Sequence, residues 1–119
     1  MELSEAQIKK AVSDYLTILQ NQGKLWFERL NSGSILAKKG DRVYKVQLCR
    51  EGTADFIVIF YWHPLGAPNK GSVVVWFFEI KDNKGKQTPA QVDFQRLVET
   101  QYCHYAVIRS VDEIMWLED

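Results

Sequence analysis

Val73-Val-Val-Trp-Phe-Phe-Glu-Ile-Lys81 is the stretch that decides the fold, because an unbroken apolar run leads directly into an acid, an apolar residue and a base. A short run of β-branched and aromatic residues predicts a buried strand. Strand side chains point alternately to the two faces, so Glu79 and Lys81 share one face and Ile80 points to the other. The stretch therefore predicts a carboxylate and an ammonium side by side at the end of a central strand, where burying charge is costly.

A second apolar run lies upstream and also carries one acid at its end. It reads Asp55-Phe-Ile-Val-Ile-Phe-Tyr-Trp62 and is followed by a loop rich in proline and glycine, residues 63–72. A connection of this kind predicts two adjacent antiparallel strands. Asp55 is then expected beside the Glu79 end of the other strand. Without this second strand, a surface ion pair of little energetic weight would be the better explanation of Glu79 and Lys81.

The remaining chain supplies helices around these strands. Ser4 and Gln7 form a capping box that opens a helix ending at Gly23, and Thr88, Pro89 and Gln91 open a second one. We expect further strands over residues 25–30 and 105–108 and a short helix over residues 111–117. Residues 35–47 are polar and basic and are predicted to form a mobile surface loop, with a short extended piece at 43–46.

The expected order is helix, strand, strand, strand, helix, strand, helix. Both long strands are apolar on both faces, which predicts an α/β fold with a mixed sheet covered by helices on each side. With 119 residues, 46% of them hydrophobic, the chain is expected to form one globular domain over residues 1–119.

The charge and the cysteine content restrict the function less than the strand patterns do. The formal net charge is zero, but two basic groups occur that fit either a phosphate-binding face or a solvated loop: Lys38, Lys39, Arg42, Lys45 and Arg50, and then Lys81, Lys84 and Lys86. For the first group alone, the solvated loop is the favoured interpretation. Cys49 and Cys103 have no metal-binding spacing and are expected to be reduced thiols of a cytoplasmic protein. No signal peptide or membrane span is expected.

The two strand ends predict a metal site. Two carboxylates that converge in one cleft, Asp55 and Glu79, repel each other unless a cation lies between them. Hard oxygen ligands suit Mg²⁺ or Mn²⁺, and the backbone carbonyl of Ile80 offers a further oxygen. Lys81 would orient a water molecule and offset charge on a phosphate. These are the requirements of phosphodiester hydrolysis.

Asp55 together with Glu79-Ile-Lys81 resembles the PD-(D/E)xK nuclease signature. The surrounding segments are similar to the VRR-NUC family, the virus-type replication-repair nucleases, over nearly the whole chain: Gly52-Thr-Ala-Asp55, Phe78-Glu-Ile-Lys81, Gly85-Lys-Gln-Thr-Pro-Ala-Gln91 and Val107-Ile-Arg-Ser-Val-Asp-Glu113. The chain departs from the superfamily pattern at Ala54, where proline is frequent.

The resemblance implies a restriction-endonuclease-like core and a metal-dependent DNA endonuclease. Asp55 and Glu79 would bind Mg²⁺ or Mn²⁺, and Lys81 would be catalytic. Gln91 matches a helix glutamine that faces the active site, although its capping role explains it equally. Glu5 matches an acid on the first helix that would reach the metal through water. Ser32, Lys84 and Lys86 would contact phosphates.

The resemblance to stand-alone phage members further implies a homodimer that acts on branched DNA such as four-way junctions, in the cytoplasm of a bacterium or a phage-infected host cell. The aromatic content, with tryptophan at positions 26, 62, 76 and 116, fits an interface or the core equally. Two other functions stay open: a non-catalytic nucleic-acid-binding module with a nuclease fold, and a small structural protein.

Overall fold

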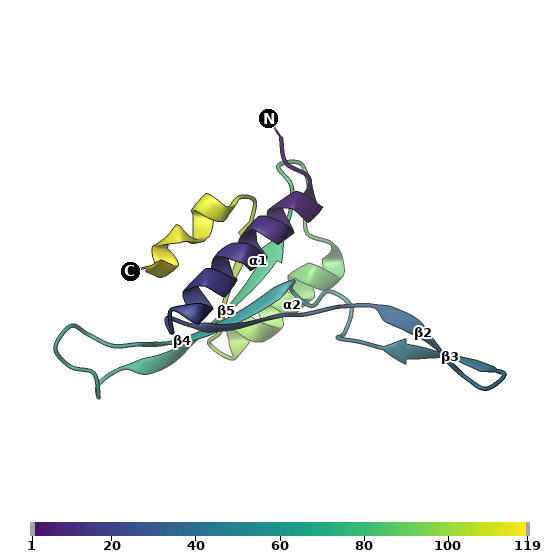
Figure 1. The fold of residues 1–119 in the computed structure, drawn as a ribbon, viewed down its shortest axis with the longest axis horizontal. Helices are drawn as coiled ribbons and strands as arrows, with labels where there is room; N and C mark the ends of the chain where they lie inside the picture. The colour runs from purple at the N-terminus through teal and green to yellow at the C-terminus, as the bar shows by residue number, and fades with distance from the viewer. Residues whose placement is uncertain (1, 119) are drawn as a thin grey trace.

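The computed structural model describes residues 2–118, and a four-stranded mixed sheet in the order β1-β4-β5-β6 forms its centre (Figure 1). The strands are β1 (Trp26–Arg29), β4 (Phe56–Trp62), β5 (Ser72–Ile80) and β6 (His104–Ile108). β4 pairs with both β1 and β5 in antiparallel fashion, whereas β6 pairs with β5 in parallel. The predicted adjacency of the two apolar strands is therefore confirmed.

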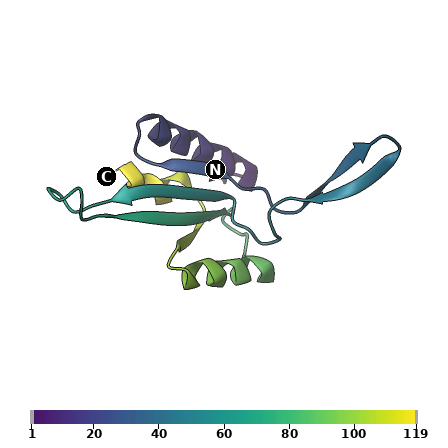
Figure 2. The same cartoon turned by 90° about the horizontal axis from the view of Figure 1, so that it is seen from below.

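Helices lie on both faces of this sheet, as the apolar strands predict. Figure 2 shows α1 (Glu5–Asn21) and the C-terminal 3₁₀ helix η1 (Val111–Glu118) on one face, and α2 (Pro89–Thr100) on the other. Both predicted capping boxes are present, at Ser4 and at Thr88. The larger core lies between α1, η1 and the sheet, and its fully buried side chains include Val12, Leu16, Phe56, Val58, Phe78, Ile80 and Ile114.

The prediction that residues 35–47 form a loop is wrong, although the extended piece expected at 43–46 is confirmed, since it lies within a strand. This segment forms an antiparallel hairpin of β2 (Ser34–Lys39) and β3 (Arg42–Gln47), which is a separate two-stranded sheet. A two-residue turn joins the strands, and Gly40 occupies its first position with a φ of 63°. Glycine adopts this left-handed region without steric cost, which favours tight hairpin turns. The chain thus has two more strands than the predicted order contained.

Smaller differences concern the ends of elements. Asp55 precedes β4 and Lys81 follows β5, so both lie just outside the strands that were predicted to include them. The C-terminal segment is a 3₁₀ helix instead of an α-helix. Cys49 and Cys103 are both free thiols. Over residues 2–118, every helix is too short or too polar to cross a lipid bilayer.

Candidate active site

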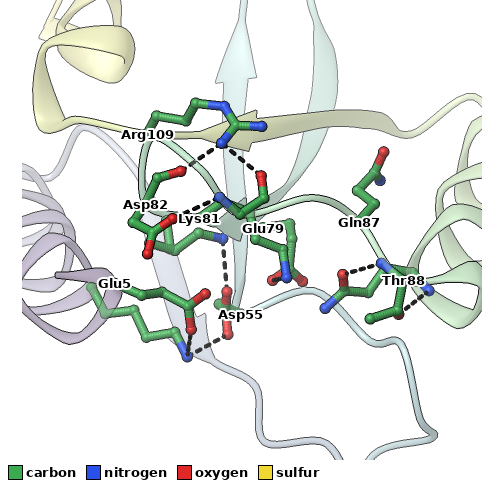
Figure 3. Close-up of polar contacts among 12 residues, drawn as sticks. Glu5, Asp55, Glu79, Lys81, Asp82, Gln87, Thr88 and Arg109 are labelled. Carbon is green, nitrogen blue, oxygen red and sulfur yellow. Dashed lines mark hydrogen bonds and ion pairs between the residues drawn. The ribbon is translucent and has the colours of Figure 1, made fainter.

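Asp55 lies at the end of the sheet where β1 ends and β4 begins. Its backbone N–H donates to the Phe78 carbonyl at 3.0 Å, and its side-chain Oδ2 accepts from the Ile80 N–H at 2.7 Å. The backbone of Asp55 therefore extends the β4–β5 pairing by one residue, and its carboxylate accepts the next N–H of the neighbouring strand. This hydrogen bond fixes the Asp55 carboxylate beside the Glu79-Ile80 backbone (Figure 3).

The loop before Asp55 is held against the start of α2. Gly52 has a φ of 88°, and a Cβ added there would lie 2.3 Å from the Ala90 carbonyl oxygen. Only glycine permits such a close approach of two backbones. Thr53 adds a hydrogen bond from its hydroxyl to the Arg50 carbonyl at 2.6 Å. The Gly52-Thr-Ala segment is therefore a structural support that places the Asp55 carboxylate.

Glu79 and Lys81 lie on the same face, as the strand alternation predicts, and both are buried. The Lys81 Nζ lies 4.0 Å from Glu79 Oε2, at the outer limit of an ion pair. The other oxygen, Oε1, is buried and has no hydrogen-bond partner among residues 2–118. Native proteins rarely leave a buried polar atom without a partner, so this oxygen needs an explanation.

The environment of Glu79 favours its protonated form. Burial and then the charge and hydrogen-bonding capacity of Asp55 raise the pKa of Glu79 to about 8, against the opposing effect of Lys81 and Lys9. A strongly raised carboxyl pKa beside a second carboxylate is common at functional sites, although structural ion-pair networks produce it too.

A lysine from α1 connects the predicted acids. The Nζ of Lys9 lies 3.2 Å from Asp55 Oδ1 and 3.3 Å from Glu5 Oε2. Burial lowers the pKa of Lys9, but Asp55 and Glu5 more than offset this effect and raise it. The Lys9 ammonium thus links Glu5 to Asp55. Its predicted role as a metal ligand through water stays a prediction.

The donor set of this site suits a hard divalent cation. It offers the Asp55 carboxylate and the unpartnered Oε1 of Glu79, with the Ile80 backbone between Glu79 and Lys81. Within the described residues, three or more His, Cys, Asp or Glu side chains do not gather at any one point in a metal-binding arrangement. Mg²⁺ commonly uses one or two protein carboxylates and completes its shell with water. The residues present therefore fit Mg²⁺ or Mn²⁺ better than a metal that needs a full protein cage.

Gln91 serves α2 as a cap. Its Oε1 accepts from the Thr88 N–H at 2.9 Å, so the capping explanation is confirmed and the catalytic role stays a prediction. A neighbouring glutamine, Gln87, donates to Gln95 Oε1 at 3.0 Å and to the Tyr105 hydroxyl at 3.1 Å. Burial is the main reason that the pKa of Tyr105 is raised to about 12. Tyr105 therefore stays protonated at neutral pH.

The predicted phosphate contacts lie in two places. Lys84 and Lys86 are exposed on the loop that follows Lys81. Asp82 holds the backbone of this loop, because its Oδ1 accepts from the Gly85 N–H at 2.6 Å. Arg109 Nη1 braces the same loop by donating to the Asp82 and Gly85 carbonyls. Ser32 is exposed at the base of the β2–β3 hairpin, where it forms an isolated bridge with Cys49. Ser32 is thus set apart from the loop that carries the two lysines.

The structure brings Asp55, Glu79 and Lys81 to one sheet end, and it adds Lys9 and Arg109, which the sequence analysis did not identify. The helical spacing of Glu5 and Lys9 predicts an i,i+4 ion pair, which is present. The contact between Lys9 and Asp55 has no comparable sequence signal, because it joins two segments that are distant in the chain.

Comparison of the chain with protein-family models, with curated proteins and with solved structures gave no match. The resemblance to the VRR-NUC family therefore stays a prediction that depends on the residues quoted above and on the geometry that they adopt.

Proposed function

We propose that the protein is a metal-dependent DNA endonuclease of the PD-(D/E)xK type that resembles the VRR-NUC family. One observation carries the proposal: the buried Glu79, with an unpartnered oxygen and a raised pKa, lies at the same sheet end as Asp55 and Lys81. The resemblance implies the same three residues.

Each residue has a defined role in the proposed reaction. Asp55 and Glu79 would hold Mg²⁺ or Mn²⁺, which when bound supplies positive charge to the attacking water and the leaving oxygen. Lys81 would orient the water and offset the negative charge that grows on the phosphate. The hydrogen bond from the Ile80 N–H keeps the Asp55 carboxylate in place, so little rearrangement is needed when substrate binds.

The same geometry favours an enzyme over the two alternatives. A buried carboxylate beside a second carboxylate costs stability unless a cation or a proton compensates it. A non-catalytic nucleic-acid-binding module or a structural protein would gain no catalytic activity in return for that cost. Either alternative would have been better served by apolar side chains at this sheet end.

Cleavage is expected with Mg²⁺ or Mn²⁺ and little or none with Ca²⁺. Ca²⁺ forms longer bonds with looser geometry, so it supports DNA binding without aligning the water. The test is incubation with labelled single-stranded, duplex, flap, splayed-arm and four-way-junction DNA under each metal. Preferential cutting of the four-way junction would support the resolvase form of the proposal. No cutting of any of these DNAs with Mg²⁺ or Mn²⁺ would refute the nuclease function.

A homodimer is proposed on the apolar sheet face beside α2. The strand register places Trp26, Ile59, Tyr61, Val73 and Val75 on the face that α2 covers only in part. Of these, Trp26, Tyr61 and Val73 are 47%, 51% and 65% exposed. Exposed aromatic and β-branched side chains of this kind are typical of interface cores, and a two-fold dimer would present two sites to a junction with matching symmetry.

Light scattering at micromolar concentration tests the dimer. The wild type is expected at twice the chain mass of 13.8 kDa, and Val73→Glu is expected at the monomer mass because the charge would be buried in the interface. Leu65→Glu is the matched control, since Leu65 is fully exposed on the 63–71 loop. A monomeric wild type, with and without a four-way junction, would remove the resolvase form and leave the nuclease proposal in place.

A further inference from the structure

The β2–β3 hairpin, residues 34–47, stands away from the rest of the molecule, and we call it the arm. Among the described elements, β2 and β3 contact only each other (Figure 1). Its base is closed by the Leu48 N–H, which donates to the Gly33 carbonyl at 2.9 Å, and by Gln47 Nε2, which donates to the same carbonyl at 2.7 Å. A two-stranded hairpin without further packing gains little stability of its own, so a bound partner would stabilise the arm.

The charge of the arm and its base is strongly positive in a chain whose formal net charge is zero. Five basic residues and one acid, Asp41, occur within residues 34–50, and the basic residues are Lys38, Lys39, Arg42, Lys45 and Arg50. All five are exposed, and none forms an ion pair with another of the described residues. Their positive charge is therefore available to a negatively charged partner.

The basic side chains lie on both faces of the arm. The register places Lys39 opposite Arg42 on one face, and it places Lys38 and Lys45 on the other. The large exposed apolar side chains are also divided, with Ile35 and Tyr44 on the first face and Leu36 and Val43 on the second. A docking surface for a second protein would gather the apolar residues on one face. Charge on both faces instead suits a partner that carries phosphates on both sides of the arm.

We infer that the arm binds the DNA beside the cleavage site by lying in a groove of the duplex between its two phosphate backbones; this inference rests on the proposed function. The major groove admits a two-stranded β-ribbon. A strand of this length spans ~20 Å at about 3.3 Å per residue, a little over half of a DNA turn. Five cations supply sequence-independent contacts to phosphates, and the Tyr44 hydroxyl offers a further hydrogen bond to a phosphate.

The position of the arm suits this role. The arm leaves the sheet at the end where β1 stops and β4 starts, and the Leu30 N–H donates to the Asp55 carbonyl there at 2.8 Å. Figure 2 shows the arm extending beyond the sheet on this side. DNA whose phosphate lies at Asp55 and Glu79 would therefore have its flanking duplex beside the arm.

The test is DNA binding without cleavage, measured by fluorescence anisotropy with labelled duplex and four-way-junction DNA in Ca²⁺ over a range of salt concentrations. Arg42→Gln with Lys45→Gln is expected to weaken binding about tenfold or more and to lower the salt slope by about 2. Lys70→Gln with Arg96→Gln removes the same charge from the far loop and from α2, and it is expected to bind as the wild type does. Replacing residues 34–47 with a short Gly-Ser connector should abolish the arm's contribution and leave the melting temperature unchanged.

Equal weakening by the arm pair and the control pair would overturn the inference, because the charge would then act without regard to position. It would also be overturned if the arm variants bound DNA normally but lost self-association in light scattering, since the arm would then serve a second copy of the chain. If the wild type binds DNA, the arm variants bind it more weakly, and neither the wild type nor the variants cut DNA with Mg²⁺ or Mn²⁺, the inference about the arm is supported and the nuclease proposal is refuted. If both double variants cut DNA normally and bind it with unchanged affinity, the nuclease proposal stands and the inference about the arm is refuted.

Discussion

Asp55→Ala and Glu79→Gln are each expected to reduce metal-dependent DNA cleavage by ~10²-fold or more, which is the usual cost of removing one group from an electrostatic catalytic site. Asp55→Ala removes a carboxylate that the Ile80 N–H holds in place at 2.7 Å. Glu79→Gln keeps the shape of the side chain but removes the charge that would bind the cation. The measurement is the single-turnover cleavage rate at matched Mg²⁺ concentration.

The control for these variants is Asp14→Asn. Asp14 is an exposed acid on α1 that pairs with Lys10 at 2.9 Å, so this change removes one carboxylate without touching the sheet end. Its cleavage rate should equal that of the wild type. Circular dichroism and melting temperature establish that each variant is folded. Undiminished cutting by a folded Asp55→Ala or Glu79→Gln protein would refute the assigned roles.

Glu79 is also expected to make the metal-free protein less stable as the pH rises. The pKa of Glu79 is raised from its ordinary value of 4.5 to about 8 in the folded chain, mainly by burial. Below pH 4.5 both the folded and the unfolded chain hold this proton. Between pH 4.5 and 8 only the folded chain holds the proton, so the free energy of unfolding falls as the pH rises. Above pH 8 both states have lost the proton, and the stability that the protonated Glu79 contributed is gone. A shift of this size would amount to about 5 kcal/mol over the window, and partial solvent access reduces it to roughly 2–4 kcal/mol.

Urea unfolding in chelator at several pH values between 5 and 9 measures this effect. Glu79→Gln should remove that part of the pH dependence and be more stable than the wild type at high pH. Glu99→Gln, an exposed change on α2, should keep the wild-type dependence. Parallel stability curves for the wild type and Glu79→Gln would show that the Glu79 side chain is not held in its protonated form.

The sequence predicted the sheet end well because the relevant signals are local and strong. The run that ends in Glu79 and the run that begins at Asp55 are long, apolar and joined by a short loop, so their antiparallel pairing followed from turn and strand patterns. The two helix starts followed from the capping residues at Ser4 and Thr88. These features require no knowledge of distant contacts.

The arm was missed because burial does not shape its sequence. Its strands pack on no other element, so residues 34–47 lack the apolar alternation of a half-buried strand. The usable signal was the Gly40-Asp41 pair between two extended segments, which is typical of a two-residue hairpin turn. The contact between Lys9 and Asp55 was missed for a different reason. It depends on how α1 lies across the sheet, and local patterns do not determine that.

Lys9 has a consequence for how the protein is made in the cell. Its ammonium lies between Asp55 and Glu5 at ion-pair distance, so the chain carries its own counter-charge at the sheet end. A nascent chain is therefore expected to complete its fold where divalent ions are scarce, and under the proposed function the ion would bind afterwards and start activity. Retention of the native circular dichroism spectrum after chelation would register this order of assembly, whereas unfolding on chelation would contradict it.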